Sequence, residues 1–497
     1  MAWPTRRGTA PLVPHTFEDP KRLPENKMQP NVLVIVSDTL RWDALGVNGG
    51  PGWLQIRTEE LDKFARESVC FDNARVSSFP TIPMRTDCFT GTFGHPRHGW
   101  QPIRSDILTL PKIFASKGYT TQLLADTTHL LRADFWRHFS HFHFLRGQEG
   151  DQYVSRTNCR PQRIVSDLSK TRVEYGRAGD EPTISEIHTH TNAWWRYESD
   201  RFSSRLADRT CQWLEDNWRG PPFFLWVDFF DVHEPWDPPE YLWRMYQPVY
   251  DGEPMIQPNY HSADAYTPEE LANLRARYAG EVTLVSKNIG RIIRLMRDMD
   301  ILDRTIVVLL SDHGIYLGER GRTGKSLITP ESFDAFPQHT ELSHLVWMMR
   351  IPGSEPKHVD GLVQPPDLLP TLVELCDIPV PSGTEGISLL PLIDGEPLRQ
   401  QRLAISAWTM HTHHSRELVY CRRPAVTDGE WTLVLQEPPD PQPPKLFHVS
   451  EDPKEHVDLM REEQQEARRL HSEMLEWLAG KGAPASALDR LRKAIPA

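Results

Sequence analysis

Two uninterrupted apolar segments of this chain end on an aspartate. Val32–Ser37 leads into Asp38, and Ile306–Ser311 leads into Asp312. Segments this rich in Val, Ile and Leu, without alternation, are typical of central strands in a sheet that is covered on both faces. Ligands of such sheets bind beyond the carboxyl ends of the strands, so we expect both aspartates at a functional edge.

Strand-like and helix-like patterns alternate from Asn31 onwards, which is typical of an α/β layered fold. A third apolar segment, Phe223–Phe230, predicts a further buried strand. The polar segment from about 146 to 200 predicts an irregular excursion over the top of the sheet. We therefore predict a large central sheet, mixed but mostly parallel, with helices on its flanks. The predicted helices are Glu59–Ser68, Leu108–Lys117, Ser203–Asn217 and Pro268–Asp298.

The pattern predicts three parts: an irregular arm over residues 1–29, a catalytic domain over 30–396 and a small C-terminal α+β subdomain over 397–497. A charged helix is expected from about Pro453. Its apolar positions recur at helical spacing and predict a face that docks onto the small sheet; they are Leu470, Met474, Trp477 and Leu478. Short antiparallel strands are expected at Leu403–Trp408, Leu418–Cys421 and Trp431–Leu435.

Composition narrows the possible partners. The 497 residues carry a formal net charge of -12, which leaves no basic excess to neutralise the phosphates of a nucleic acid. No apolar run reaches the roughly 18 residues that a membrane span needs, and the polar, Pro-rich start lacks the apolar core of a signal peptide. The six cysteines are scattered, which favours reduced core thiols. The expected location is therefore the cytoplasm, without a membrane partner.

Asp38, Asp312 and His313 are candidate metal ligands. Two carboxylates and an imidazole that meet at one sheet edge suit Ca²⁺, Mg²⁺ or Mn²⁺, and the imidazole leaves room for Zn²⁺. The alternative is that each aspartate caps a helix that follows its strand, a common role for Asp. Metal binding is the favoured interpretation because His313 and Gly314 follow directly on the second aspartate.

The ordered motifs resemble the sulfatase family of the alkaline-phosphatase superfamily over nearly the whole chain, from about residue 31 to 480. The matching stretches include NVLVIVSDTLRWDALG, SSFPTIPMRTDCFTGTFGHPRHGW, PFFLWVDFFDVHEPWDPPE and TIVVLLSDHGIYLGERG. Each stretch alone is weak, and their order and spacing carry the resemblance. It implies an alkaline-phosphatase-like fold, a metal-dependent hydrolase, and metal-ligand positions at Asp38, Asp312 and His313.

The sequence departs from this family at Thr81. Sulfatases carry C-x-P-S-R, whose cysteine is oxidised to the formylglycine nucleophile, and this chain has Thr81-Ile-Pro83-Met-Arg85 at that place. Threonine cannot become the aldehyde, and it therefore lacks the hydrated gem-diol whose second hydroxyl would expel sulfate. Water can attack a phospho-threonine in line, so Thr81 favours phosphoryl transfer. Arg85 is expected to contact the nucleophile or the transferred group through its planar charged side chain. The alternative role for Thr81 is that it caps the turn before Pro83.

Further departures concern the groups that bind the anion. Thr39 replaces the second of two adjacent acids, and Ala125–His129 replaces the usual G-K-W-H, so that its lysine is missing and His129 is out of step by one. His233 and Lys325 remain as anion-binding candidates, although Lys325 also fits a solvated loop. One metal site is favoured. Spare candidates for a second are Asp228, Asp231, His339 and His344.

The sequence predicts a metal-dependent hydrolase that cleaves a phosphate mono- or diester (a phosphodiesterase in the latter case) or a phosphonate ester. Thr81 is the predicted nucleophile, and the other predicted catalytic groups are Arg85, His233 and Lys325. The residues predicted to bind a small anionic ester are His129, His233 and Lys325. One alternative is a sulfuric ester hydrolase that acts without formylglycine. Another is a non-catalytic descendant that binds an anion or a partner. The oligomeric state is left open.

Overall fold

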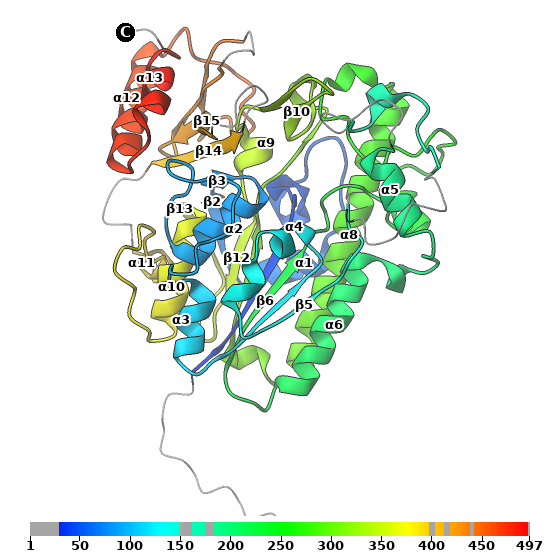
Figure 1. Ribbon diagram of the computed structural model, residues 1–497, viewed down its shortest axis with the longest axis vertical. Coiled ribbons are helices and arrows are strands. Elements are labelled where there is room, and N and C mark those ends of the chain that lie inside the picture. The colour runs from blue at the N-terminus through cyan, green and yellow to red at the C-terminus, as the bar shows by residue number, and fades with distance from the viewer. Residues whose placement is uncertain are drawn as a thin grey trace, which may run out of the picture.

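The computed structural model describes residues 29–149, 151, 162–173, 182–396, 403–411, 418–437 and 442–495. Its main element is an eight-stranded sheet in the order β13-β2-β12-β7-β1-β6-β4-β5, covered by helices on both faces (Figure 1). β12 runs antiparallel to both of its neighbours, and the other pairs are parallel. The predicted mixed, mostly parallel sheet is thus confirmed. Its strands are β1 (Asn31–Ser37), β2 (Val69–Ala74), β4 (Thr120–Ala125), β5 (His141–Phe144), β6 (Phe223–Phe229), β7 (Thr305–Ser311), β12 (Trp347–Arg350) and β13 (Lys357–Val363).

The two aspartate-ended segments lie side by side at the centre of this sheet. Every residue of β1, β6 and β7 is buried, as their continuous apolar sequences require. β1 pairs in parallel with β7, and Ser37 stands opposite Ser311. Asp38 and Asp312 follow these two serines directly, so the strand register alone brings the two carboxylates to the same point on the sheet edge.

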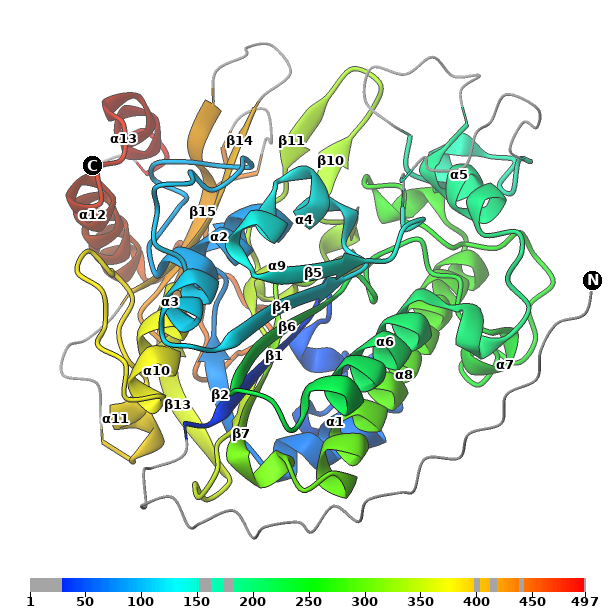
Figure 2. The same cartoon turned by 60° about the horizontal axis from the view of Figure 1, so that its bottom comes forward.

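Helices form a layer on each face of the sheet (Figure 2). One layer contains α1 (Glu59–Arg66), α6 (Phe202–Asn217) and α8 (Pro268–Asp298), which pack into one apolar cluster with β1, β6 and β7. The other contains α2 (Thr81–Thr90), α3 (Leu110–Ser116) and α10 (Leu368–Leu375). α8 begins and ends where the sequence predicted, and its start is fixed by a capping box between Thr267 and Glu270.

Short elements surround the strand ends. The segment expected to be irregular between 146 and 200 contains a helix, α5 (Ile184–Thr191), whose start is fixed by a capping box between Thr183 and Glu186. The T-x-x-E pattern from Thr183 to Glu186 is the local signal in the sequence for this helix start. Two small hairpins, β8 (Tyr316–Leu317) with β9 (Thr323–Gly324) and β10 (Ser326–Ile328) with β11 (Phe333–Ala335), follow β7. The remaining short helices are α4 (Thr128–Arg132), α7 (Glu240–Trp243), α9 (Thr340–Ser343) and α11 (Leu390–Ile393).

A second, five-stranded sheet lies beside the first in the order β17-β16-β15-β14-β3. Its last strand, β3 (Ser78–Phe79), belongs to the segment directly before Thr81, so residues after 396 do not build this sheet alone. The helices α12 (Gln464–Gly480) and α13 (Ala485–Arg492) cover it. The other strands are β14 (Ala404–His411), β15 (Leu418–Thr427), β16 (Trp431–Val434) and β17 (Lys445–His448).

The predicted docking face of α12 is confirmed: Leu470, Met474 and Leu478 are fully buried in the core of the small sheet. The helix begins at Gln464, however, and not near Pro453. The segment between Pro453 and Gln464 contacts the central part of the protein instead, where Glu455 binds His339. The predicted arm over 1–29 lies almost wholly outside the described residues. None of the described helices has the length and apolarity that crossing a bilayer requires.

Candidate active site

Asp38, Asp312 and His313 meet at the carboxyl ends of β1 and β7. All three side chains are fully buried, and one ligand atom from each lies within 4.8 Å of the others. The main-chain oxygen of Gly314 accepts a hydrogen bond from His313 Nδ1 at 3.0 Å, which leaves His313 Nε2 as the atom that faces the carboxylates. Nε2 has no hydrogen-bond partner among the described residues. Neither aspartate caps a helix, because each precedes an irregular segment.

The protonation of these residues fits a divalent cation. Burial lowers the pKa of His313 to about 3, so the imidazole is neutral and available as a ligand. Burial, and then the charge of Asp312, raises the pKa of Asp38 well above its usual range. Two facing carboxylates in an apolar interior repel one another, and a metal ion between them removes that cost. Asp38, Asp312 and His313 therefore form a suitable set of metal ligands.

Thr39, which the sequence resemblance puts at the second of two adjacent acids, orients both carboxylates. Its hydroxyl donates to Asp38 Oδ1 at 2.9 Å, and its backbone N–H donates to Asp312 Oδ1 at 2.9 Å. The residue adopts a left-handed backbone conformation, with φ at 61°, which is uncommon for a β-branched side chain. Thr39 therefore fixes the positions of the two acids and adds no further charge.

Arg85, on α2, connects three buried aspartates. Its Nε and Nη2 form a two-pronged contact with Asp228 at 2.8 and 2.9 Å, Nη1 donates to Asp312 at 2.6 Å and Nη2 donates to Asp38 at 3.3 Å. Nη1 also donates to the main-chain oxygen of Thr81 at 3.0 Å. These contacts occupy all five N–H donors of the guanidinium. The expected contact with a transferred group would need one of these donors to be released.

Thr81 is the first residue of α2 and is 2% exposed. The residue that caps this ten-residue helix is Pro80, so Thr81 itself is not the turn cap that the sequence left open. The first turn of a helix presents free backbone N–H groups and the positive end of the helix dipole, which favour an anion. Through its carbonyl, Thr81 is tied to the guanidinium that contacts both candidate metal-ligand aspartates.

Lys325 and His233 lie in the same electrostatic neighbourhood. Lys325 directly follows β9 and is only 6% exposed, so the alternative that it is a solvated loop lysine is wrong. Its Nζ has no hydrogen-bond partner among the described residues. Its charge acts on Asp38, His313 and His233. Burial lowers the pKa of His233 to about 4, and its Nδ1 donates to the main-chain oxygen of Glu234 at 2.7 Å. An unpaired cation therefore accompanies a neutral imidazole beside the acids.

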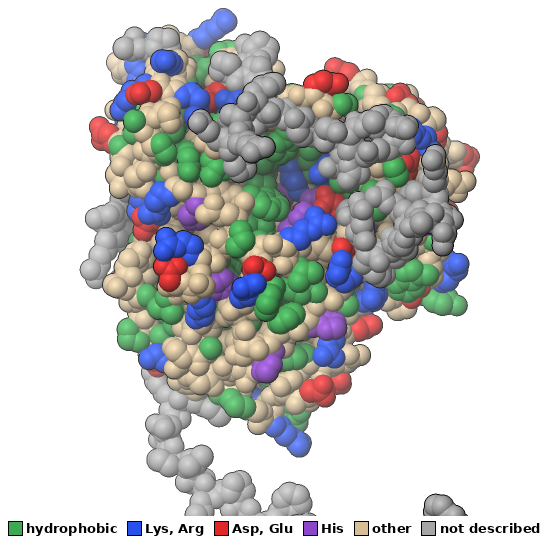
Figure 3. Space-filling view, viewed as in Figure 1, with side chains coloured by type: hydrophobic (Ala, Val, Ile, Leu, Met, Phe, Trp, Pro, Cys, Tyr) green, Lys and Arg blue, Asp and Glu red, His purple; other side chains and the backbone are tan. Residues whose placement is uncertain are grey.

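His129, at the start of α4, contacts residues that sequence reasoning missed. Its Nε2 lies 3.0 Å from Glu149, which also binds Arg172 at 3.0 Å. Burial alone would raise the pKa of Glu149, but the contacts with His129 and Arg172 hold that pKa well below its usual range. No motif surrounds Glu149 and Arg172, because both come from the segment expected to be an irregular excursion. Figure 3 shows a hollow above α4 in which basic and histidine side chains gather.

Aromatic rings border this group. Trp100, 42% exposed, packs edge-on against His129 with ring centres 5.0 Å apart, and Phe230 stacks on His233 at 4.1 Å. Trp100 gives the site an apolar border at the surface, whereas Phe230 is fully buried against His233.

The spare candidates for a second metal make other contacts. Asp228 binds Arg85, and Asp231 accepts hydrogen bonds from Gln148 and Ser203. His339 binds Glu455 at 2.6 Å, and His344 donates to the main-chain oxygen of Asp72 at 2.7 Å. Within the described ranges, Asp38, Asp312 and His313 are the one group of acids and histidines with metal-ligand geometry.

The edge of the central sheet thus carries a group of two acids and a histidine that could hold a divalent metal, with a buried cation beside it. A family model described as "Sulfatase" matches residues 30–378. The chain belongs to the sulfatase family and is an ester-hydrolysing enzyme.

Similar proteins include both sulfatases and phosphonate hydrolases. The chain is 25% identical to an arylsulfatase from Clostridium perfringens, over 94% of this chain and 100% of that protein. It is 24% identical to arylsulfatase K from Xenopus laevis, over 87% of this chain and 79% of that protein. Among solved structures, it resembles the phosphonate monoester hydrolase of Agrobacterium radiobacter with a TM-score of 0.68 and 21% identity, over 91% and 96% of the two chains. It also resembles a phosphonate monoester hydrolase from Silicibacter pomeroyi, with a TM-score of 0.65 and 20% identity, over 92% of this chain and 96% of that chain.

Proposed function

We propose that this enzyme hydrolyses a phosphate mono- or diester or a phosphonate ester, with Thr81 as the nucleophile. The observation that carries the proposal is that Thr81, which the sequence resemblance puts at the family's nucleophile position, is the first residue of α2 and accepts a hydrogen bond from Arg85 through its main-chain oxygen. Phosphorus accepts both attacks that such a route needs, first by the threonine hydroxyl and then by water. The structural resemblance to two phosphonate monoester hydrolases supports this substrate class.

A divalent metal held by Asp38, Asp312 and His313 would, when bound, polarise the ester and lower the pKa of the Thr81 hydroxyl. Ca²⁺, Mg²⁺, Mn²⁺ and Zn²⁺ all suit this ligand set, and we favour one ion. Arg85 acts as a positioning residue, because its five donors hold the aspartates and the Thr81 carbonyl.

Lys325 and His233 complete the proposed chemistry. The Lys325 ammonium binds the non-bridging oxygens of the phosphoryl group, since it is buried and its Nζ lacks a partner among the described residues. The Thr81 oxygen attacks phosphorus while its proton passes to His233 Nε2, since Nδ1 already donates to Glu234. The bond from phosphorus to the ester oxygen breaks, and His233 returns the proton to the departing alcohol, which leaves phospho-Thr81. Water then attacks phosphorus and gives a proton to His233; the bond from phosphorus to the Thr81 oxygen breaks, that oxygen takes the proton back, and the acid product leaves. His129 and Trp100 border the leaving group.

Sulfate-ester hydrolysis without formylglycine is the second candidate function. The arylsulfatase relatives, one of which matches over its whole length, favour it. The chemistry opposes it, because a sulfo-threonine lacks the second hydroxyl that would expel sulfate. A non-catalytic role is the third candidate, and the buried, unpaired Lys325 beside three candidate metal ligands counts against it.

A panel of aryl substrates tests the proposal: a sulfate, a phosphate monoester, a phosphate diester and a phosphonate ester, each assayed with Mg²⁺, Mn²⁺, Ca²⁺ and Zn²⁺. We expect hydrolysis of at least one phosphorus ester and a loss of about 10³-fold or more in Thr81→Ala. Thr90→Ala is the matched control, since Thr90 lies on the same helix and its hydroxyl bonds within it. Hydrolysis of the sulfate alone, or full activity in Thr81→Ala, would refute the proposal.

A further inference from the structure

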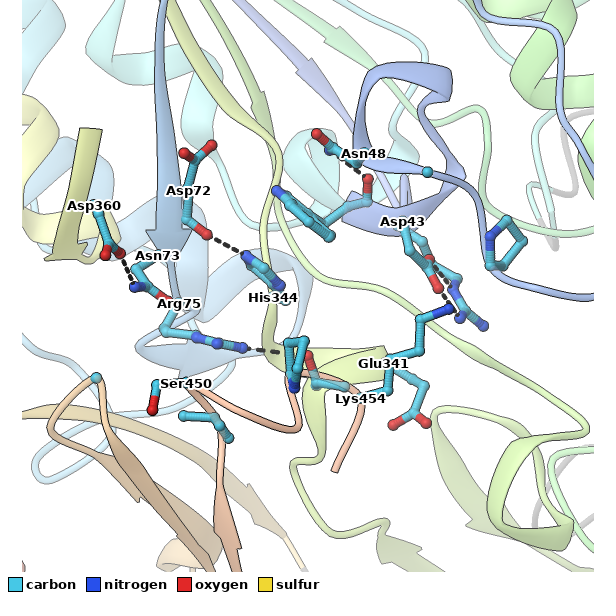
Figure 4. Close-up of a pocket in the computed structure, with 18 of the residues that line it drawn as sticks. Asp43, Asn48, Asp72, Asn73, Arg75, Glu341, His344, Asp360, Ser450 and Lys454 are labelled. Carbon is cyan, nitrogen blue, oxygen red and sulfur yellow. Dashed lines mark hydrogen bonds and ion pairs between the residues drawn. The ribbon is translucent and has the colours of Figure 1, made fainter. Parts of the chain in front are cut away.

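A cavity of about 770 Å³ lies beside β2 and β13, apart from the candidate active site (Figure 4). Asp360, on its wall, accepts a hydrogen bond from the side chain of Asn73 on β2. The described walls of this cavity include neither His233 nor Lys325. The two proposed anion-binding groups are therefore supported from elsewhere, and Tyr260 contacts the segments that carry both of them.

Tyr260 packs against the backbone next to Lys325. The tyrosine lies in the irregular segment between α7 and α8, and Lys325 directly follows Gly324. A Cβ on Gly324 would lie 2.7 Å from Tyr260 Cγ and 2.8 Å from its Cα, so only glycine permits this approach. On the other side of Lys325, the N–H of Ile328 donates to the main-chain oxygen of Tyr260 at 3.0 Å. Tyr260 therefore holds the backbone both before and after Lys325.

The hydroxyl of the same tyrosine supports the segment that carries His233. Tyr260 is 1% exposed, and its hydroxyl donates to Oε1 of Glu234, which is fully buried. Glu234 accepts the bond from His233 Nδ1 through its main-chain oxygen, and its Oε2 lies 3.5 Å from the same nitrogen. Burial alone would raise the pKa of Glu234, but its basic neighbours His233 and Lys325 hold that pKa below its usual value. Glu234 is thus an anion that Tyr260 and His233 contact from two sides.

The backbone of Tyr260 is strained. Its φ of 56° lies in the left-handed region, which is uncommon for a bulky side chain. Such strain persists only where the surrounding contacts over-determine the conformation, and strained residues gather at functional sites. The guanidinium of Arg172 lies over the Tyr260 ring, 4.9 Å from the ring centre, and also 3.8 Å from Glu234. Contacts with the neighbours of both anion-binding groups therefore offset the strain.

We propose that Tyr260 is a positioning residue that places His233 and Lys325 relative to each other. Its ring and backbone hold Lys325, and its hydroxyl holds His233 through Glu234. The two effects can be separated, because phenylalanine keeps the ring and removes only the hydroxyl. The inference rests on the proposed roles of His233 in proton transfer and of Lys325 in binding charged oxygens, and it applies equally to a phosphorus ester and a sulfate ester.

Steady-state kinetics with the best substrate of the ester panel test the proposal. Tyr260→Phe should lower kcat about 10-fold and leave KM within about 2-fold, since only the support of His233 is lost. Tyr260→Leu, which also removes the ring, should in addition raise KM about 10-fold or more, because Lys325 is displaced. The matched control is Tyr119→Phe, which should change neither constant. Tyr119 is buried, and its hydroxyl donates to the main-chain oxygen of Pro30 at the opposite end of the sheet.

A double-mutant cycle assigns the hydroxyl effect to the contact between Tyr260 and Glu234. Glu234→Met fills similar volume and accepts no hydrogen bond. Adding Tyr260→Phe to Glu234→Met should lower kcat by less than about 2-fold, because the contact is already gone. Adding Tyr260→Phe to Asp360→Met, which removes an exposed acid from the cavity of Figure 4, should cost the full factor of about 10.

Inorganic phosphate and sulfate, titrated calorimetrically into the full chain, measure the effect on Lys325 without turnover. Lys325→Ala and Tyr260→Leu should each weaken anion binding about 10-fold or more, and Tyr260→Phe should leave it unchanged. These titrations stand even if no phosphorus ester is hydrolysed, so failure of the phosphoester proposal is a separate outcome.

Three results would overturn the proposal. The first is wild-type kcat in Tyr260→Phe, or a full loss when that change is added to Glu234→Met. The second is anion binding in Tyr260→Leu that matches the wild type. The third is a wild-type chain that neither binds these anions nor hydrolyses any ester of the panel. Tyr260→Phe keeps the test decisive if Tyr260→Leu fails to fold, because it retains the ring.

Discussion

Arg85→Met removes a guanidinium that contacts three fully buried aspartates. Methionine fills similar volume but donates no hydrogen bond, so Asp38, Asp228 and Asp312 lose their shared counter-charge. Each must then protonate, find another partner or remain as a buried anion. Asp228 keeps bonds from Thr127 at 2.6 Å and from the Trp226 ring at 2.9 Å, so it is partly compensated.

The expected cost follows from the number of pairs that break. Removing one partner of a single buried ion pair costs about 3–5 kcal/mol. The three contacts of Arg85 share one cation and do not add independently, so we expect a loss of at least about 3–5 kcal/mol in the free energy of unfolding. Adding Asp228→Asn to Arg85→Met should return about 1–3 kcal/mol, because the amide no longer leaves a charge unpaired.

Urea unfolding of the chelated protein measures this effect, since a bound metal would itself neutralise Asp38 and Asp312. The matched control is Arg104→Met, which breaks an exposed pair with Asp106 and should leave stability nearly unchanged. Adding Mg²⁺ or Mn²⁺ should narrow the gap between Arg85→Met and the wild type. A loss below about 1 kcal/mol in chelated Arg85→Met would refute the reasoning that Arg85 is the counter-ion of this cluster.

Three other predictions test neighbouring parts of the account. Asp38→Asn should weaken metal binding about 100-fold or more in a calorimetric titration, and unchanged affinity would remove Asp38 from the ligand set. Lys325→Ala should lower kcat/KM for the preferred ester about 10²- to 10³-fold, and an unchanged value would exclude substrate contact. Burial raises the pKa of Asp87 from 3.8 to about 7, so the folded protein holds a proton that the unfolded chain releases. Stability should therefore fall between about pH 4 and pH 7, by up to about 1.4 kcal/mol per pH unit, and Asp87→Asn should flatten that slope in unfolding curves, whereas Asp106→Asn should not.

The sequence was most informative where local pattern and tertiary burial agree. β1 and β7 are continuous apolar strands, and each ends on an acid, so the edge that brings Asp38 and Asp312 together followed from the pattern alone. The long helix α8 was bounded correctly because its start has both a capping box and a proline at the first position.

Residues that act across the fold were harder to predict. Arg85 meets acids that are 47, 143 and 227 residues away in the chain, and no local pattern records such a contact. Asp228 offered one usable signal, since an acid inside an otherwise apolar strand requires a buried partner. Glu149 and Arg172 offered none, because they come from a polar segment whose path depends on the groups that it covers.

The central claim is that Thr81 carries the phosphoryl group, and trapping that intermediate tests it most directly. The metal-loaded enzyme is mixed with its preferred aryl ester, quenched in acid during turnover, digested and analysed by high-resolution mass spectrometry, which separates phosphoryl from sulfuryl. The account predicts a transient phosphoryl group on Thr81 that is absent without metal and absent in Thr81→Ala. A sulfuryl group on Thr81, or turnover with Thr81 unmodified at every quench time, would contradict it.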